Sequence, residues 1–369
     1  HFVRSAKWER APCAAHPSRF PPIHRRGPMA LDRRDFLKIA GAQAGLLVAT
    51  GACASAGSTR AGAPSPFSGA PALGSTARDV IVTGAGVFGT WTALNLRQMG
   101  AKVTLVDTWG PGNSRSTSGD ETRGVRTSYG DRETGEQWMR WASEAIKRWK
   151  RFDEEWAKDL GAPLFYTTGD LIMREDWEPF LCETRALWQK VGIPFESLPP
   201  GELAYRWPVI GSQDIGAVLY EPDAGVVRAR ASCLAVAEIF EKLGGEIVVD
   251  RVQTSMAANG SIDQIYLTNG ETMRADAYVY ACGPWLPKVF PDLFGDRMRT
   301  PIGNVFYMAT PSGDHSYEFP NIPSWNFPGV TGWPALPPDH RGFRVRTGGG
   351  GLTDPDISDR WIPIERHQR

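Results

Sequence analysis

The sequence predicts an α/β fold into which an α+β domain built on a mixed sheet is inserted. Short β-branched runs at 79–83 and 102–106 are typical of buried parallel strands. Amphipathic stretches at 90–99 and 231–243 are typical of helices that cover such a sheet, and further short strands are expected at 246–250 and 277–281. Thr268-Asn269-Gly270 separates strand patterns at 261–267 and 271–275, which predicts an antiparallel hairpin. Strands, helices and a hairpin that feed one sheet give this fold class.

A glycine-rich turn joins the first predicted strand to the first predicted helix. Asp79-Val80-Ile81-Val82-Thr83 leads directly into Gly84-Ala85-Gly86-Val87-Phe88-Gly89. Gly84 permits a tight turn, Gly86 lets the backbone approach a pyrophosphate, and Gly89 lets helix and strand pack closely. The helix N-terminus that follows offers free amide groups to phosphates. Asp107 ends the second strand, where a carboxylate can accept from ribose hydroxyls. This order of elements predicts a Rossmann-type dinucleotide site rather than a simple turn.

The segment after Asp107 indicates which kind of dinucleotide the predicted site binds. An NAD-dependent dehydrogenase would continue into regular βα units, whereas a loop rich in Gly, Ser, Thr and Arg follows at 109–130. Within it, Gly119-Asp120-Glu121-Thr122-Arg123-Gly124-Val125-Arg126 and then Tyr129-Gly130 resemble the D-amino-acid oxidase superfamily of flavoproteins, in particular its branch with monomeric sarcosine oxidase and N-methyltryptophan oxidase. Similar segments follow in consistent order at 166–171, 205–208, 220–227, 281–285 and 300–305.

The resemblance implies FAD as the cofactor and a reaction that oxidises a C–N bond of a secondary amine, an N-methyl amino acid or another amino acid. It divides the chain into an FAD-binding domain at 77–162 and 223–298 and a substrate domain at 163–222 and 299–369. The predicted cofactor-binding residues are Gly84, Gly86, Val87, Phe88, Gly89, Asp107, Ser118, Gly119, Thr122, Arg123, Val252, Gly283 and Trp285. Asp120 and Glu121 are weaker candidates.

Three arginines are the predicted catalytic residues. By the resemblance, Arg126 binds the substrate carboxylate and Arg123 lies near the negative charge of the reduced flavin. An arginine fork pairs bidentately with a carboxylate, which suits the first role. The alternative for Arg123 and Arg126 is a solvated loop charge. Arg344 stands where the family has its oxygen-activating lysine, so the electron acceptor is either oxygen or another molecule.

The substrate itself is not specified by the sequence beyond a small amine or amino acid. Tyr307, Trp325 and Trp333 are candidates for lining its pocket, although a core position suits these aromatic side chains equally.

The first 76 residues are predicted to lie outside the fold. Residues 1–28 are interpreted as upstream or disordered sequence, and 29–56 as a twin-arginine-type signal with Arg33-Arg34, a short apolar run and a small-residue exit. Residues 57–76 are then a linker. We expect export to the periplasm without a permanent membrane span, because the apolar run is too short. A lipid anchor at Cys53 is the minority alternative.

Composition excludes several other classes of function. Lys plus Arg and Asp plus Glu both number 41, so no net charge points to nucleic acid. The cysteines and histidines form no ligand cluster, and no metal site is predicted.

The chain is also expected to stop before the end of the family's FAD-binding domain. Three hypotheses therefore compete: an FAD-dependent amine or amino-acid oxidoreductase, an inactive truncated remnant that binds FAD weakly or not at all, and an NAD-dependent dehydrogenase.

Overall fold

The computed structural model describes residues 78–254, 260–348 and 354–357. The predicted upstream segment, the signal with Cys53 and the linker, which together make up residues 1–76, lie outside these ranges. No helix in the described ranges has the length and apolar character needed to cross a membrane.

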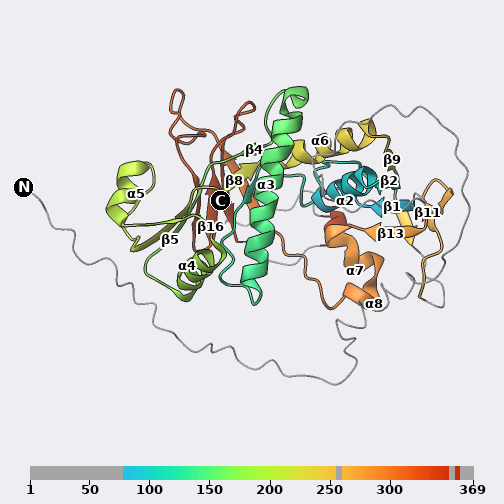
Figure 1. Ribbon diagram of the computed structural model, residues 1–369, viewed down its shortest axis with the longest axis horizontal. Helices are drawn as coiled ribbons and strands as arrows, with labels where there is room; N and C mark the ends of the chain where they lie inside the picture. The colour runs from blue at the N-terminus through green and yellow to red at the C-terminus, as the bar shows by residue number, and fades with distance from the viewer. Residues whose placement is uncertain (1–77, 255–259, 349–353, 358–369) are drawn as a thin grey trace, which may run out of the picture. The chain divides into compact units, whose positions relative to one another are not determined.

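The glycine-rich motif lies in a four-stranded parallel sheet with the order β13-β1-β2-β9. Its strands are β1 (Asp79–Thr83), β2 (Lys102–Asp107), β9 (Glu246–Val249) and β13 (Ala277–Tyr280). Helices α2 (Val87–Gln98) and α6 (Ala229–Lys242) pack on it through a shared apolar core. The predicted strands and both predicted helices are present, so the Rossmann-type part of the prediction is confirmed. Figure 1 shows α2 and α6 beside these strands.

A mixed sheet of seven strands forms the second layer, with the order β14-β17-β16-β15-β5-β7-β6. The pair β15–β5 is parallel and the other pairs are antiparallel. The strands are β5 (Asp170–Arg174), β6 (Glu196–Leu198), β7 (Ala217–Glu221), β14 (Asn304–Met308), β15 (Ser324–Phe327), β16 (Val330–Trp333) and β17 (Phe343–Thr347). The predicted mixed sheet is thus confirmed.

Two three-stranded sheets hold the other strands of the described ranges. One has the order β3-β8-β4, with β3 (Arg123–Val125), β4 (Phe165–Tyr166) and β8 (Gly225–Val227). The other contains β10 (Val252–Thr254), β11 (Ile265–Leu267) and β12 (Thr272–Met273), and its antiparallel β11–β12 pair is the predicted Asn-Gly hairpin. The other helices in the described part of the chain are α3 (Gly135–Leu160), α4 (Pro179–Val191), α5 (Pro200–Arg206), α7 (Leu286–Val289) and α8 (Pro291–Phe294), with 3-10 turns at Gly283–Trp285 and Pro355–Ile357.

Helix α3 joins the two layers. Ile146, Trp149 and Phe152 pack into the core of the parallel sheet, whereas Met139 packs with Trp188 of α4 beneath the seven-stranded sheet. Figure 1 shows α3 between the two groups of strands. Burial of these large apolar side chains at both ends of one helix fixes the two layers against each other.

Candidate active site

The glycine-rich turn between β1 and α2 tolerates no side chain at two of its three glycines. A Cβ at Gly89 would lie 1.6 Å from the carbonyl oxygen of Gly84, and a Cβ at Gly84 would lie 2.5 Å from that of Ala281. Gly84 also has a φ of +101°, which favours glycine. Gly86 is different, because its Cβ would meet nothing closer than the Ser118 Oγ at 3.4 Å. Gly84 and Gly89 therefore shape the turn, and Gly86 leaves its backbone open.

The N-terminus of α2 presents a positive end to the space in front of this turn. Its first turn holds no acidic residue, and Gly86 at the N-cap supplies no side chain. The Val87 amide donates to Ser118 Oγ at 3.1 Å, and the Phe88 side chain is 80% exposed. The first amides of a helix have no intrahelical acceptor, so this end can receive phosphate.

Asp107 holds the turn from the neighbouring strand. Its Oδ2 accepts from the Ala85 amide at 2.7 Å and its Oδ1 from the Trp109 amide at 2.8 Å. Burial raises the pKa of this carboxyl group, against the lowering effect of the backbone hydrogen bonds. Each carboxylate oxygen can accept more than one hydrogen bond, so Asp107 keeps the capacity to accept from a ribose hydroxyl. The contact with a ribose stays a prediction.

A cavity of about 430 Å³ opens in front of the turn. This volume is in the range of ligand sites. Nine of the predicted cofactor-binding residues line it: Gly84, Gly86, Val87, Phe88, Asp107, Ser118, Val252, Gly283 and Trp285. Gly89, Gly119, Thr122 and Arg123 do not line it. Gly119 instead packs against the Asn113 carbonyl, where a Cβ would lie at 2.0 Å.

The structure adds lining residues that the sequence did not indicate. Trp109 and Trp285 lie with ring centroids 5.2 Å apart at the cavity, and the Trp285 indole N–H donates to Asp356 at 2.8 Å. Lys288 and Tyr280 also line the cavity. Asp356 lies 71 residues after Trp285 in the sequence, so only the three-dimensional structure brings the two together.

Asp120 is the centre of a second group of polar side chains. Its Oδ1 accepts from the Tyr307 hydroxyl at 2.6 Å, and its Oδ2 from Arg344 Nη2 at 2.6 Å. Arg123 Nε lies 3.4 Å from the same Oδ2. The Tyr307 hydroxyl further accepts from the Thr122 amide at 3.2 Å. The structure therefore brings two of the three predicted catalytic arginines, Arg123 and Arg344, onto one carboxylate.

Arg344 is completely buried, and its guanidinium lies 3.9 Å from the ring centroid of Trp333. Within the described part of the chain, Arg344 Nε and Nη1 and Arg123 Nε have no hydrogen-bond acceptor. Burial lowers the pKa of Arg123, while Asp120 raises it. A buried donor without an acceptor lowers the stability of the folded state, unless a bound group supplies the acceptor. Of the aromatic candidates, Tyr307 and Trp333 thus lie in this group, and Trp325 packs against Phe343.

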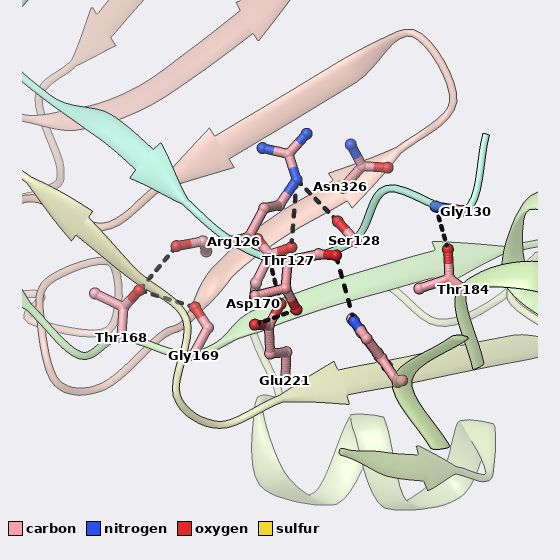
Figure 2. A network of polar contacts seen from close by, with 12 residues as sticks. Arg126, Thr127, Ser128, Gly130, Thr168, Gly169, Asp170, Thr184, Glu221 and Asn326 are labelled. Carbon is pink, nitrogen blue, oxygen red and sulfur yellow. Dashed lines mark hydrogen bonds and ion pairs between the residues drawn. The ribbon is translucent and has the colours of Figure 1, made fainter. Parts of the chain in front are cut away.

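The third predicted arginine, Arg126, lies in a separate network (Figure 2). Its Nε donates to Ser128 Oγ at 3.0 Å and lies 3.8 Å from Asp170 Oδ2. In Figure 2 its two terminal nitrogens point away from the carboxylates of Asp170 and Glu221. The Arg126 side chain is 31% exposed, so its terminal fork is accessible.

One chain segment connects the cavity to both networks. Thr117 and Ser118 line the cavity, and the Thr117 carbonyl accepts from Arg123 Nη2. Arg123 begins β3, and Arg126 follows its end. No group of three or more His, Cys, Asp or Glu side chains suited to a metal ion occurs in residues 78–254, 260–348 and 354–357.

Comparison with known proteins assigns this architecture. Residues 79–362 match the sequence family described as DAO, FAD dependent oxidoreductase. The chain belongs to this family. Both the predicted family and FAD as its cofactor are confirmed, which disfavours the NAD-dependent alternative. The N-methyl-L-tryptophan oxidase of Yersinia pestis (strain Pestoides F) is 24% identical over 238 residues, which are 64% of this chain and 61% of that protein. The chain thus spans about three fifths of the length of the curated relatives that it matches.

Solved structures share the fold. The L-proline dehydrogenase of P. horikoshii aligns with a TM-score of 0.58 at 19% identity, covering 76% of this chain and 71% of that one. The glycine oxidase of Geobacillus kaustophilus aligns with a TM-score of 0.57 at 17% identity, covering 74% and 73%. A thermally stable mutant of fructosyl peptide oxidase gives 0.60 at 20% identity, covering 74% and 64%.

The residues present fit FAD on this chain's own geometry. The glycine turn and the open helix N-terminus suit a pyrophosphate. Arg123 Nη2 donates to the carbonyl of Thr117, which lines the cavity, so the positive charge of Arg123 lies next to the segment that borders the space for a cofactor. The open backbone at Gly86, the helix N-terminus without an acidic residue and the cavity in front of both are the features of a site shaped for a dinucleotide.

Proposed function

We propose that this chain acts in an FAD-dependent oxidoreductase that removes a hydride from the carbon next to the nitrogen of a secondary amine, an N-methyl amino acid or another amino acid. The accessible fork of Arg126 is the observation that carries the proposal. Similar proteins include one named for N-methyl-L-tryptophan and one named for glycine, substrates that hold an amine and a carboxylate together.

Arg126 would hold the substrate carboxylate through two parallel hydrogen bonds, which fixes the orientation of the carbon that bears the amine. Bound FAD supplies the hydride acceptor. Arg123, on the same segment and next to the Thr117 carbonyl at the cavity, would place positive charge where negative charge develops on reduction. Tyr307 and Asp120 hold Arg344 and Arg123 in place.

For the electron acceptor, we propose a molecule other than oxygen. Arg344 stands where the resemblance places an oxygen-activating lysine, and its charge is compensated by Asp120 and covered by Trp333. A guanidinium held in this way differs in size and hydration from a free ammonium. The expected result is slow reoxidation of the reduced protein in air and fast reoxidation by an artificial dye. Equally fast reoxidation by air would contradict this assignment.

The hydride-transfer proposal is tested by anaerobic bleaching of the flavin band of the FAD-loaded protein. N-Methyl amino acids should bleach it, and the same amines without a carboxylate should do so poorly. Arg126→Gln should raise KM on the order of tenfold to a hundredfold, because a charge-assisted hydrogen bond contributes about 1.5 to 3 kcal/mol. Arg140→Gln, which changes an exposed arginine on α3, is the matched control. Equal bleaching by amines with and without a carboxylate would exclude the role of Arg126.

We further propose export by the twin-arginine-type signal at 29–56, which lies outside the described residues. Arg33→Lys together with Arg34→Lys in a fusion with a periplasmic reporter should abolish the reporter signal. Unchanged export of that variant would reject the proposal.

A further inference from the structure

Two buried carboxylates face each other next to Arg126. Asp170 at the start of β5 is the register partner of Glu221 at the end of β7, and only 4% of Asp170 and 1% of Glu221 are exposed. Side chains directly opposite in an antiparallel pair have Cβ atoms about 4.5 to 5.5 Å apart. The two acids are therefore close enough to share one electrostatic environment (Figure 2).

Their hydrogen bonds are unequal. Both oxygens of Glu221 accept from Thr127, Oε1 from the Thr127 hydroxyl at 2.7 Å and Oε2 from its amide at 3.0 Å. Asp170 Oδ2 is buried and accepts no hydrogen bond within the described part of the chain. Glu221 therefore fixes the backbone directly after Arg126, while Asp170 lies 3.8 Å from the Arg126 Nε.

The charges around the pair do not balance two carboxylates. Arg126 and Arg174 are the cations that act on Asp170, and Arg126 acts on Glu221. Arg174 is itself engaged by Glu178 of α4 and by Asn326 of β15. The hydrogen-bond partner of Glu221 is neutral, because it is Thr127, whose carbonyl accepts in turn from the Trp188 indole. Burial raises the pKa of Asp170 to about 6 and that of Glu221 to about 7.

We propose that Asp170 and Glu221 hold one proton between them and act as positioning residues for Arg126, an inference that rests on the substrate-carboxylate role proposed above. With one proton, the pair and Arg126 together carry no net charge, and Arg126 can accept an anionic substrate. Without that proton the same group is net negative, so the substrate carboxylate is repelled.

Infrared difference spectroscopy of the full chain tests the proton directly and needs neither substrate nor flavin. A band of a protonated carboxyl group should be present at pH 6, should disappear as the pH rises to 8 to 9, and should be absent in Glu221→Gln. Asp170→Asn leaves the Thr127 contacts unchanged and gives a second variant in case Glu221→Gln folds poorly. Glu183→Gln, an exposed acid on α4, should keep the band. A wild-type spectrum without the band at pH 6 overturns the proposal.

Binding of acetate to the FAD-loaded protein, followed by the flavin spectrum, tests the effect on Arg126. The Kd should rise up to about tenfold per pH unit above the titration of the pair, and this slope should vanish in Glu221→Gln. During turnover the same pH change should raise KM far more than it lowers kcat. A carboxyl band combined with a pH-independent Kd would refute the positioning role. The band without any carboxylate binding would instead refute the role of Arg126 in the proposed function and leave the shared proton standing.

Discussion

The ion pair between Asp120 and Arg344 should contribute strongly to stability. Arg344 is 0% exposed at its side chain and Asp120 is 12% exposed, and the two are joined at 2.6 Å. Arg344→Met keeps an unbranched side chain of similar length but leaves Asp120 without its closest cation. Removal of one partner from a buried pair costs about 3 to 5 kcal/mol, because the other charge stays buried. Loss of the guanidinium above Trp333 adds up to about 2 kcal/mol.

Asp120→Asn should be costly for the complementary reason. Its amide can offer one oxygen, to Tyr307 or to Arg344, and then turns an N–H donor toward the other. The double variant removes both charges of the closest pair, although Arg123 loses its contact with the carboxylate, so it should cost less than the two single changes added together. We expect a coupling free energy of about 2 to 3 kcal/mol, the upper end for residues in contact.

Urea unfolding of the four proteins in the cycle measures this coupling. The exposed pair of Glu238 and Lys242 on α6 provides a control cycle, in which solvent screening should leave little coupling. A coupling below about 0.5 kcal/mol for Asp120 and Arg344, the additive limit for independent sites, would refute the interpretation of this pair as the centre of the network.

Two further predictions concern the glycine turn and the buried acids. Gly89→Ala should prevent flavin binding and lower the thermal unfolding temperature, because its Cβ would overlap the Gly84 carbonyl oxygen at 1.6 Å. Gly86→Ala, the control, should fold normally. Equal unfolding temperatures of the two variants would contradict this prediction. Since burial raises the pKa values of Asp170 and Glu221 to about 6 and about 7, the folded state binds more protons than the unfolded state between pH 4 and 7. The free energy of unfolding should therefore fall as the pH rises through this range, by up to about 1.4 kcal/mol per pH unit for each of the two groups. The stability of Glu221→Gln relative to wild type should therefore improve as the pH rises, and a difference that stays constant from pH 4 to 8 in chemical unfolding would exclude the raised pKa.

The parts of the fold that follow from local patterns could be predicted from the sequence. β1, the glycine turn and β2 lie where the β-branched runs and glycines indicate. Helix α2 begins at Val87, three residues before the expected start at Thr90, because the extended backbone of Gly86 already forms the N-cap and Gly89 is accommodated inside the helix. The family-like segment at 300–305 contributes only its last two residues to β14 (Asn304–Met308), since Pro301 lacks the amide that a sheet ladder needs.

The polar networks could not be predicted in this way. Asp120 meets Tyr307 and Arg344 across 187 and 224 residues of sequence, and Glu221 meets Thr127 across 94. Neither the spacing nor the periodicity of residues in the sequence predicts contacts over such separations. The resemblance indicated all three arginines but not their partners, so the compensation of the Arg344 charge by Asp120 emerged only from the packing of β17 against the loop before β3.

Binding of FAD is the central claim, and the visible absorption spectrum of the purified full chain tests it most directly. With flavin counted per polypeptide after incubation with FAD and removal of the excess, we predict a flavin band that corresponds to about one FAD per chain. A folded, monodisperse protein that remains colourless after this treatment would contradict the account, and it would favour the remnant that does not bind the cofactor.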